Sequence, residues 1–251
     1  MTRAIIEVSG QDASKFLQGL VTNDLRKLER DGIVYAAFLS PQGKYLADFF
    51  LVARPDGVIW IDVAPPIAAE LLRRLAAFKL RAQVSLTPLD IAVSRGTGPA
   101  PAGALPDPRH PALGWRLYGQ ALPDDGTDWD ALRVAHCIPE SGIELLPNET
   151  FILEAGFERL HGVDFRKGCY VGQEVTARMQ HKTSLRKGLV TVGIEGCAPV
   201  GAEIVAAGKP AGQVFTQAGN KAIAYLRFDR ASAEMQADSA RLFWQAEAEP
   251  A

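Results

Sequence analysis

Cysteine and histidine are scarce in this sequence, which holds three cysteines and four histidines among 251 residues. Cys137, Cys169 and Cys197 are odd in number and lie about 30 residues apart, which excludes a disulfide framework and a Cys-x-x-Cys metal clip. The histidines form no His-Glu-x-x-His or similar pair. We therefore expect no metal site in this chain and a reducing compartment.

Long apolar runs are also absent. No segment reaches the roughly 18 apolar residues of a membrane span, and Glu7 interrupts the apolar run that a signal peptide would need. A formal net charge of -2 gives no overall field that would attract nucleic acid or an anionic membrane. We expect a monomeric protein of the cytoplasm with no membrane partner.

The first 95 residues alternate between β-rich and helical patterns. Helical spacing of apolar residues follows the first β-rich run, and the turn at residues 40–43 joins two further runs into a hairpin. In chain order the predicted elements are strand 3–8, helix 13–20, strands 33–39, 44–53 and 58–63, helix 67–80 and strand 91–94. We expect these elements to form an α+β unit over residues 1–95.

Proline and glycine are concentrated at residues 96–111, where five prolines and three glycines disfavour regular structure. We interpret this segment as a linker. Residues 112–186 predict a second α+β unit, with a strand at 115–118 and a helix at about 127–137. From residue 187 short β-rich runs recur between Gly and Pro turns, and they predict a small β-barrel over residues 187–251.

Two glycines, Gly168 and Gly172, bracket Cys169, and a run of good helix formers follows. A helix that begins near Gly172 has an apolar seam and a charged face. The seam holds Val171, Val175 and Met179, and the charged face holds Glu174, Arg178, His181 and Lys182. One face of the helix can therefore pack while the other stays available for chemistry.

The chemistry of this segment favours a reactive thiol. Lys167, Arg166 and the unpaired amides of a helix N-terminus would stabilise a thiolate over a thiol at Cys169. The two glycines remove β-carbons, so that a ligand or partner can approach the backbone. A structural role, with Cys169 as a small core residue between turn glycines, fits the pattern equally well. The residues alone leave both interpretations open.

Residues 167–174 resemble a known signature. They read K-G-C-Y-V-G-Q-E and match the K-G-C-Y-x-G-Q-E motif of the YgfZ-like proteins, relatives of the glycine-cleavage aminomethyltransferases. Residues 16–24, F-L-Q-G-L-V-T-N-D, resemble the F-L-Q-G-x-x-T-x-D segment of the same family. The positions that carry the signature are Lys167, Gly168, Cys169, Tyr170, Gly172, Gln173 and Glu174.

This resemblance implies a fold, a cofactor and a function. The implied fold is α+β, with ferredoxin-like folate-binding units of the aminomethyltransferase fold followed by a small C-terminal β-barrel. The implied function is that of a tetrahydrofolate-binding accessory protein in iron–sulfur cluster assembly or repair. It includes an indirect role in tRNA modification, with Cys169 as the reactive thiol. The implied partners are iron–sulfur client or assembly proteins and tetrahydrofolate or a derivative of it.

A folate site needs a buried carboxylate, ring-packing groups and nearby cations. The resemblance to the aminomethyltransferases assigns carboxylates of such a site to Asp48 and Glu140, with Glu154 ranked below Glu140. Arg178 supplies a cation. For the acids, an outward-facing charge on a strand or a carboxylate that caps a helix fits equally well.

Three departures from the family pattern weaken the case for aminomethyl transfer. Thr183 stands where family members commonly have a glycine after the basic residue. Arg3 stands where some members have a folate-stacking tryptophan, and Phe49 stands where the aminomethyltransferases have a second acidic residue beside Asp48. A folate-dependent aminomethyl or one-carbon transferase is therefore the alternative function. A thiol hydrolase built on Cys169 and His181 is disfavoured, because a helix would separate them by roughly 15 Å.

Direct contact with tRNA is a further possibility that the sequence disfavours. It would need a local basic patch, and such a run of charges is more often a solvated face. The residues of the patch would be Arg178, Lys182, Arg186 and Lys187.

Overall fold

The computed structural model describes residues 3–181 and 184–245. They divide into two compact units that each draw on separate stretches of chain. The described residues of unit 1 are 3–127, 146–152 and 157–181, and those of unit 2 are 128–145, 153–156 and 184–245. No helix of the described residues is both long enough and apolar enough to cross a membrane.

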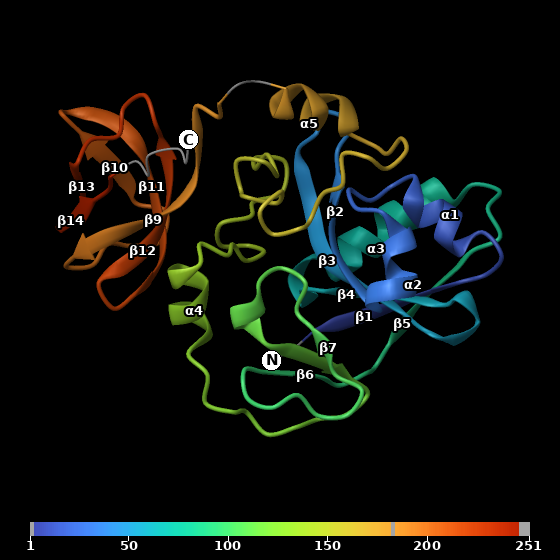
Figure 1. Ribbon diagram of the computed structural model, residues 1–251. Helices are drawn as coiled ribbons and strands as arrows, with labels where there is room; N and C mark the ends of the chain where they lie inside the picture. Colours follow the sequence, from blue (N-terminus) through green and yellow to red (C-terminus); the bar gives the residue numbers. More distant parts are fainter. Residues whose placement is uncertain (1–2, 182–183, 246–251) are drawn as a thin grey trace. The chain divides into compact units, whose positions relative to one another are not determined.

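An antiparallel sheet with the strand order β2-β3-β4-β1-β5 is the frame of unit 1. Its strands are β1 (Ala4–Ser9), β2 (Ile33–Leu39), β3 (Tyr45–Ala53), β4 (Ile59–Val63) and β5 (Ser85–Leu89). The helices of unit 1 are α1 (Ala13–Gln18), α2 (Leu28–Asp31), α3 (Pro65–Lys79) and α5 (Gln173–Gln180), with short 3-10 turns at Leu25–Lys27, Pro55–Gly57 and Pro111–Leu113. Figure 1 shows α1 and α3 on the same side of this sheet.

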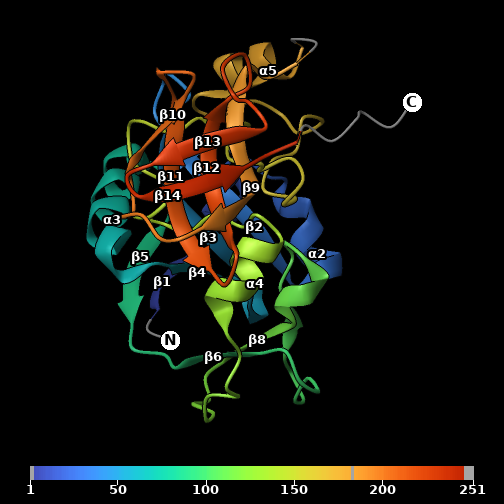
Figure 2. The same cartoon turned by 90° about the vertical axis from the view of Figure 1, so that its left-hand side faces the viewer.

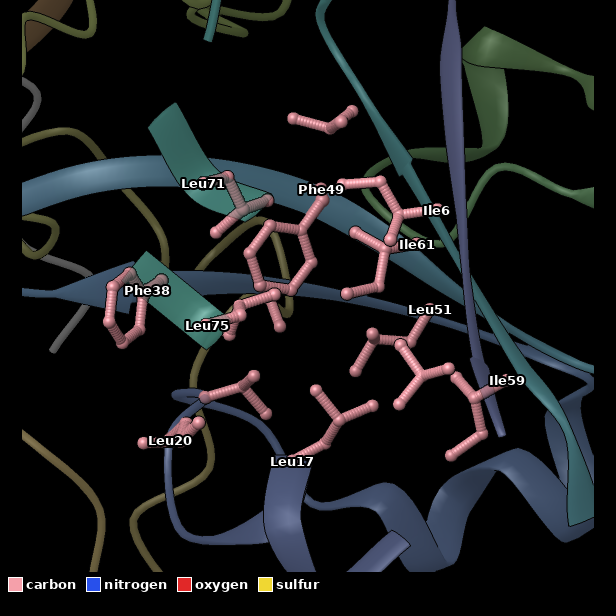
Figure 3. Close-up of a cluster of buried hydrophobic side chains, with 14 of the residues drawn as sticks. Ile6, Leu17, Leu20, Phe38, Phe49, Leu51, Ile59, Ile61, Leu71 and Leu75 are labelled. Carbon is pink, nitrogen blue, oxygen red and sulfur yellow. The ribbon is translucent and has the colours of Figure 1, made fainter. Parts of the chain in front are cut away.

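The apolar core of unit 1 lies between that side of the sheet and the two helices. Alternate residues of β3 and β4, among them Phe49 and Ile61, point into it, and Leu71 and Leu75 of α3 meet them at i, i+4 spacing. Figure 3 shows these side chains together with Leu17 of α1. Each such side chain stabilises the fold by about 1.5–3 kcal/mol when it is fully buried.

A cluster of buried charges occupies the opposite side of the sheet. It is formed with a small sheet of order β6-β8-β7, whose strands are β6 (Val93–Gly96), β7 (Leu105–Pro106) and β8 (Trp115–Tyr118). Arg116 of β8 donates to Asp62 of β4 at 2.7 Å, and Arg3 pairs with the same carboxylate. The Arg116 guanidinium lies 4.0 Å from the centre of the Phe50 ring. Burial alone would raise the pKa of Asp62, but Arg116 and Arg3 outweigh it and lower that pKa.

Unit 2 joins one helix to a closed barrel. The barrel order is β10-β11-β12-β9-β14-β13, and Figure 2 shows its strands face on. The strands are β9 (Lys187–Glu195), β10 (Glu203–Ala206), β11 (Lys209–Ala218), β12 (Lys221–Arg227), β13 (Glu234–Ala237) and β14 (Ala240–Phe243). Buried Arg133 of α4 (Trp129–Ala135) bonds Thr216 of β11 at 2.9 Å and Glu144 at 3.1 Å. This network fastens the helix to the barrel.

The structure confirms the predicted α+β class with a β-barrel toward the C-terminus. The strand predicted at 33–39 matches β2 residue for residue, and the helix predicted to begin near Gly172 is α5. The sequence patterns did not predict β5. This edge strand is mostly exposed and contains a proline, a residue that edge strands tolerate. The sequence patterns also missed β13, a strand of only four residues.

The segment predicted to be a linker, 96–111, is irregular over most of its length, as expected. It is nevertheless tied to the rest of unit 1, because β7 pairs with β8 and Asp107 is buried between Arg109 and Arg116. By compactness the chain divides into the two units above and not at the borders 95, 111 and 186 proposed from the sequence. The reason is that residues 112–186 contribute to both units.

The charge cluster gives a first prediction. Replacing Arg116 with Met should lower the free energy of unfolding by about 3–5 kcal/mol, because Asp62 keeps its buried charge and loses its strongest partner. Urea unfolding followed by circular dichroism measures the change. The matched control is Arg73→Met on α3, which removes an exposed pair with Glu70 and should cost about 1 kcal/mol or less. Equal stability losses in the two variants would show that the cluster is not stabilising.

Candidate functional site

The two segments that carry the family resemblance lie against each other in unit 1. Lys167 of the signature is buried, and its Nζ donates to three backbone carbonyls of the N-terminal segment. These are the carbonyls of Gln18 at 2.8 Å, of Asn23 at 3.0 Å and of Val21. The ammonium thus joins residues that are more than 140 positions apart in the chain.

Further hydrogen bonds connect the same two segments. Backbone bonds run from Val171 N to Gly19 O at 3.3 Å and from Asp164 N to Thr22 O at 3.0 Å. Side chains of the N-terminal segment reach back as well. Thr22 Oγ1 donates to Gly162 O at 2.6 Å, and Asn23 Nδ2 donates to His161 O at 2.6 Å. Together these bonds fix the course of residues 161–171 along residues 18–24.

Cys169 is exposed. It lies between Lys167 and Val171, two residues whose hydrogen bonds to the N-terminal segment anchor the loop. Gly168 beside it has open space, since a β-carbon built there would meet no heavy atom within 4 Å. The structural alternative from the sequence, in which Cys169 is a buried core residue, is therefore wrong. The thiol stands at the surface of unit 1 on a short loop held at both ends.

Gly172, unlike Gly168, lies in a tightly packed position. Its φ is +83°, and a β-carbon there would lie 2.5 Å from the carbonyl oxygen of Ser40, in the turn between β2 and β3. Val175 of α5 packs against Gly43 of the same turn. Gly172 therefore lets α5 begin directly against the hairpin, which is a packing requirement and not an opening for a ligand.

The remaining signature residues support the start of α5. Tyr170 is buried, which raises the pKa of its hydroxyl, and its backbone N–H donates to Gln173 Oε1 at 3.0 Å. Glu174, in the first turn of α5, is exposed, where its charge suits a helix N-terminus. Arg178 in the last turn is exposed as well.

The predicted faces of α5 are present in part. The seam residues Val171, Val175 and Met179 are half-buried, whereas Glu174, Arg178 and His181 are exposed. The fully buried side chain of the helix is Thr176, which the apolar pattern did not indicate. Lys182 and Thr183 lie outside the described residues.

The charge of Lys167 also has a role that the sequence did not indicate. We expected it to act on the thiol of Cys169, but the ammonium is engaged by carbonyl oxygens. Burial lowers the pKa of Lys167 to about 8, and the carboxylates of Asp24 and Asp164 oppose that decrease. The side chain therefore remains mostly protonated at neutral pH.

Asp48 of β3 is buried on the charged side of the sheet. Its carboxylate accepts the hydroxyl of Tyr35 at 2.9 Å and that of Tyr45 at 2.7 Å. Burial and the nearby Asp48 charge raise the pKa of Tyr35 well above its usual value, so this hydroxyl keeps its proton and donates. Tyr35 also stacks on Phe157 at a centroid distance of 5.1 Å. The buried carboxylate and aromatic rings expected near Asp48 are thus present.

The two candidate glutamates belong to unit 2. Glu140 is half-exposed and pairs with Arg133 at 3.0 Å. Glu154 is buried and accepts the hydroxyl of Tyr225 at 2.6 Å, and burial together with this bond raises the pKa of Tyr225. Asp48 and Arg178, in contrast, are residues of unit 1.

Two further features concern ligands. Across residues 3–181 and 184–245, no group of three or more His, Cys, Asp or Glu side chains could hold a metal ion. A cavity of about 550 Å³ lies beside the edge strand β2, lined in part by Lys27, Arg30, Pro106 and His161. The sequence did not predict this cavity, because its walls come from three separate stretches of chain, 23–35, 106–108 and 161.

The contrast between the signature glycines gives a second prediction. Gly172→Ala should lower the free energy of unfolding by about 2–4 kcal/mol, because the methyl group meets the Ser40 carbonyl and the backbone needs a positive φ. Gly168→Ala, the matched control, should change it by less than about 0.5 kcal/mol, since open space surrounds that position. Urea unfolding of both variants measures the difference, and a harmless Gly172→Ala would contradict the packing role.

Comparisons with known proteins identify relatives of the whole chain and of its barrel. Residues 186–248 match a family model described as the CAF17 C-terminal beta-barrel domain. The chain has a TM-score of 0.76 to the crystal structure of glycine cleavage system aminomethyltransferase T from Bartonella henselae, over 97% of this chain and 83% of that one. Because the identity is 15%, this likeness shows the fold alone, which is the aminomethyltransferase fold expected from the sequence.

The curated relatives are iron–sulfur cluster assembly factors by name. The mitochondrial factor IBA57 of Mus musculus is 30% identical over 90% of this chain and 75% of the mouse protein. The IBA57 homolog of Mycosarcoma maydis is 36% identical and that of Neurospora crassa 31%, over 75% and 79% of this chain. The chain spans about half the length of these fungal relatives, 54% in each case. Its identity and coverage against the mouse protein show that this chain belongs to the IBA57 family.

Proposed function

We propose that this protein acts in the assembly or repair of iron–sulfur clusters and that the thiol of Cys169 contacts the cluster during this work. The observation that carries the proposal is the exposed Cys169, held on a short loop between the anchors Lys167 and Val171. The names of the relatives, which describe iron–sulfur cluster assembly factors, support it.

The chemistry of a thiolate suits this role. Cysteine thiolates are the usual ligands of iron–sulfur clusters, and a cluster takes four protein ligands. The other two cysteines, Cys137 and Cys197, belong to unit 2, so the loop itself offers one thiol. We propose that a cluster in contact with Cys169 takes its other ligands from a partner, which would be an iron–sulfur client or assembly protein. In this scheme the cluster is cargo and not a resident group of this chain.

Tetrahydrofolate or a derivative is the cofactor that we propose from the resemblance to the YgfZ-like proteins. The chemistry of the residues suits it. The Asp48 carboxylate accepts two tyrosine hydroxyls, and the Tyr35 and Phe157 rings lie beside it. The exposed Arg178 would hold the anionic tail. When bound, a folate would supply one-carbon chemistry.

The wider setting of the protein follows from the same proposal. Enzymes that modify tRNA with the help of iron–sulfur clusters would be affected indirectly, without direct tRNA contact by this chain. The alternative of an aminomethyl transferase gains no support from the fold, because a likeness at 15% identity carries no activity. A cytoplasmic location and a monomeric state stay predictions, and the names of the relatives place those proteins in mitochondria.

The thiol can be tested in a strain that lacks its own family member. Cys169→Ser should reduce the activity of iron–sulfur enzymes at least about tenfold relative to the wild-type chain, since weaker changes around metal ligands already cost that much. The matched control is Cys197→Ser, which alters another exposed cysteine. Thiomethylation of tRNA serves as a second readout. Full rescue by Cys169→Ser would remove the thiol from the proposed function.

Folate binding has a separate test. Titration of tetrahydrofolate into the purified protein should quench tryptophan fluorescence to saturation, and Asp48→Asn should weaken binding at least about tenfold, which is about 1.4 kcal/mol. Asp56→Asn, in the exposed turn between β3 and β4, is the control and should bind as the wild type does. A linear, unsaturable signal in the wild type would show that folate is not a ligand of this chain.

A further inference from the structure

The side chain of Lys167 is a buried cation, and no carboxylate of the described residues is in hydrogen-bond contact with it. Its Nζ donates to three carbonyls, and Gln18, which supplies one of them, is the last residue of α1. Carbonyls at the end of a helix have no partner within the helix and carry a partial negative charge. An ammonium group with three donors can satisfy several of them at once.

An apolar side chain would fill the same space but would donate no hydrogen bonds to these carbonyls. The stem of Met or Leu could pack there, but the carbonyls of Val21 and Asn23 would then be buried without this donor, and the half-buried Gln18 would lose it as well. Burying an ammonium is costly, and here the carbonyl bonds offset that cost. The arrangement is therefore specific to a cation that reaches Val21 and Asn23 from the signature loop.

We propose that Lys167 is a positioning residue. Its ammonium fastens the Cys169 loop to the end of α1 and so fixes the place where the thiol meets an incoming cluster. The inference rests on the function proposed above, because only then does the thiol have a cluster to meet. It goes beyond that function by assigning a task to a residue that never touches the cargo.

The length of the loop shows why this anchor matters. Three residues, 168–170, separate Lys167 from Val171, whose N–H bonds to Gly19 O. Three residues span at most about 10 Å when fully extended. With both ends fixed, Cys169 can move little, although open space surrounds Gly168. Without the Lys167 bonds, the nearest backbone bond before Cys169 that ties the described part of the loop to the N-terminal segment is that of Asp164 N to Thr22 O, five residues away.

A nitroxide label on Cys169 tests this inference directly. Cys137→Ser and Cys197→Ser leave Cys169 as the single labelled thiol. In this background the label should give the broad spectrum of a group that tumbles with the protein. Lys167→Met should give the narrow spectrum of a loop that moves on the nanosecond timescale. Measurement well below the melting temperature, with unchanged circular dichroism, separates loop motion from loss of the fold.

Two variants complete the comparison. Lys167→Arg keeps a cation that can donate to carbonyls and should restore a broad spectrum. Arg73→Met on α3 removes an exposed cation of the same unit and should leave the spectrum unchanged. If Lys167→Met does not fold, Lys167→Gln, whose amide offers two donors, should give intermediate mobility. A label that stays immobile in Lys167→Met, or in Lys167→Gln in its place, overturns the proposal.

The outcome is independent of the cell assay for Cys169. A mobile label in Lys167→Met shows the clamp even when no cluster is present. If Cys169→Ser nevertheless supports full iron–sulfur enzyme activity, the proposed function fails while the clamp itself stands. If the label responds as expected and Cys169→Ser is inactive, Lys167→Met should also lose activity in cells, and Lys167→Arg should regain part of it. Full activity of Lys167→Met would then overturn its positioning role.

Discussion

The buried ammonium group of Lys167, together with the backbone and side-chain bonds around it, joins the two segments of unit 1 on which the proposed function depends. The Nζ of Lys167 is buried among the carbonyls of Gln18, Val21 and Asn23, and in this position it is costly to bury and costly to remove. The segment that follows α1 curves so that its carbonyls converge on one point, and the signature loop is drawn to the same point. The two stretches that resemble the YgfZ-like proteins are thus two halves of one structure.

Much of the frame could be predicted from the sequence. A continuous apolar run followed by turn residues located β2, and the run of helix formers after Gly172 located α5. The partners of Lys167 could not be predicted, because they are backbone carbonyls, which every residue carries and no side-chain pattern marks. Gly168 and Gly172 look alike in the sequence, yet open space surrounds one and a carbonyl oxygen presses on the other. Such differences depend on tertiary contacts that local patterns do not contain.

The main sheet of unit 1 separates an apolar core from a cluster of charged and aromatic side chains. One side carries the apolar core under α1 and α3, and the other carries Asp62, Asp48 and the rings of Tyr35 and Phe50. Phe49, which stands where a second acid was expected, points into the core, while Arg3, at the position of a stacking tryptophan, pairs with Asp62. Both departures from the family therefore have a structural use in this chain. Any cofactor on the charged side would join a network that is already hydrogen-bonded.

The contact between Gly172 and the hairpin turn has a consequence for the evolution of the chain. Because α5 begins against Ser40 and Gly43, the length of that turn determines where the start of α5 lies relative to the hairpin. A residue inserted between β2 and β3 would lift the start of α5 and strain the loop that carries Cys169. The length of the hairpin turn therefore helps to set the position of the Cys169 thiol. We expect changes of turn length in this family to be accompanied by changes in the signature, although the two are about 130 residues apart in the chain.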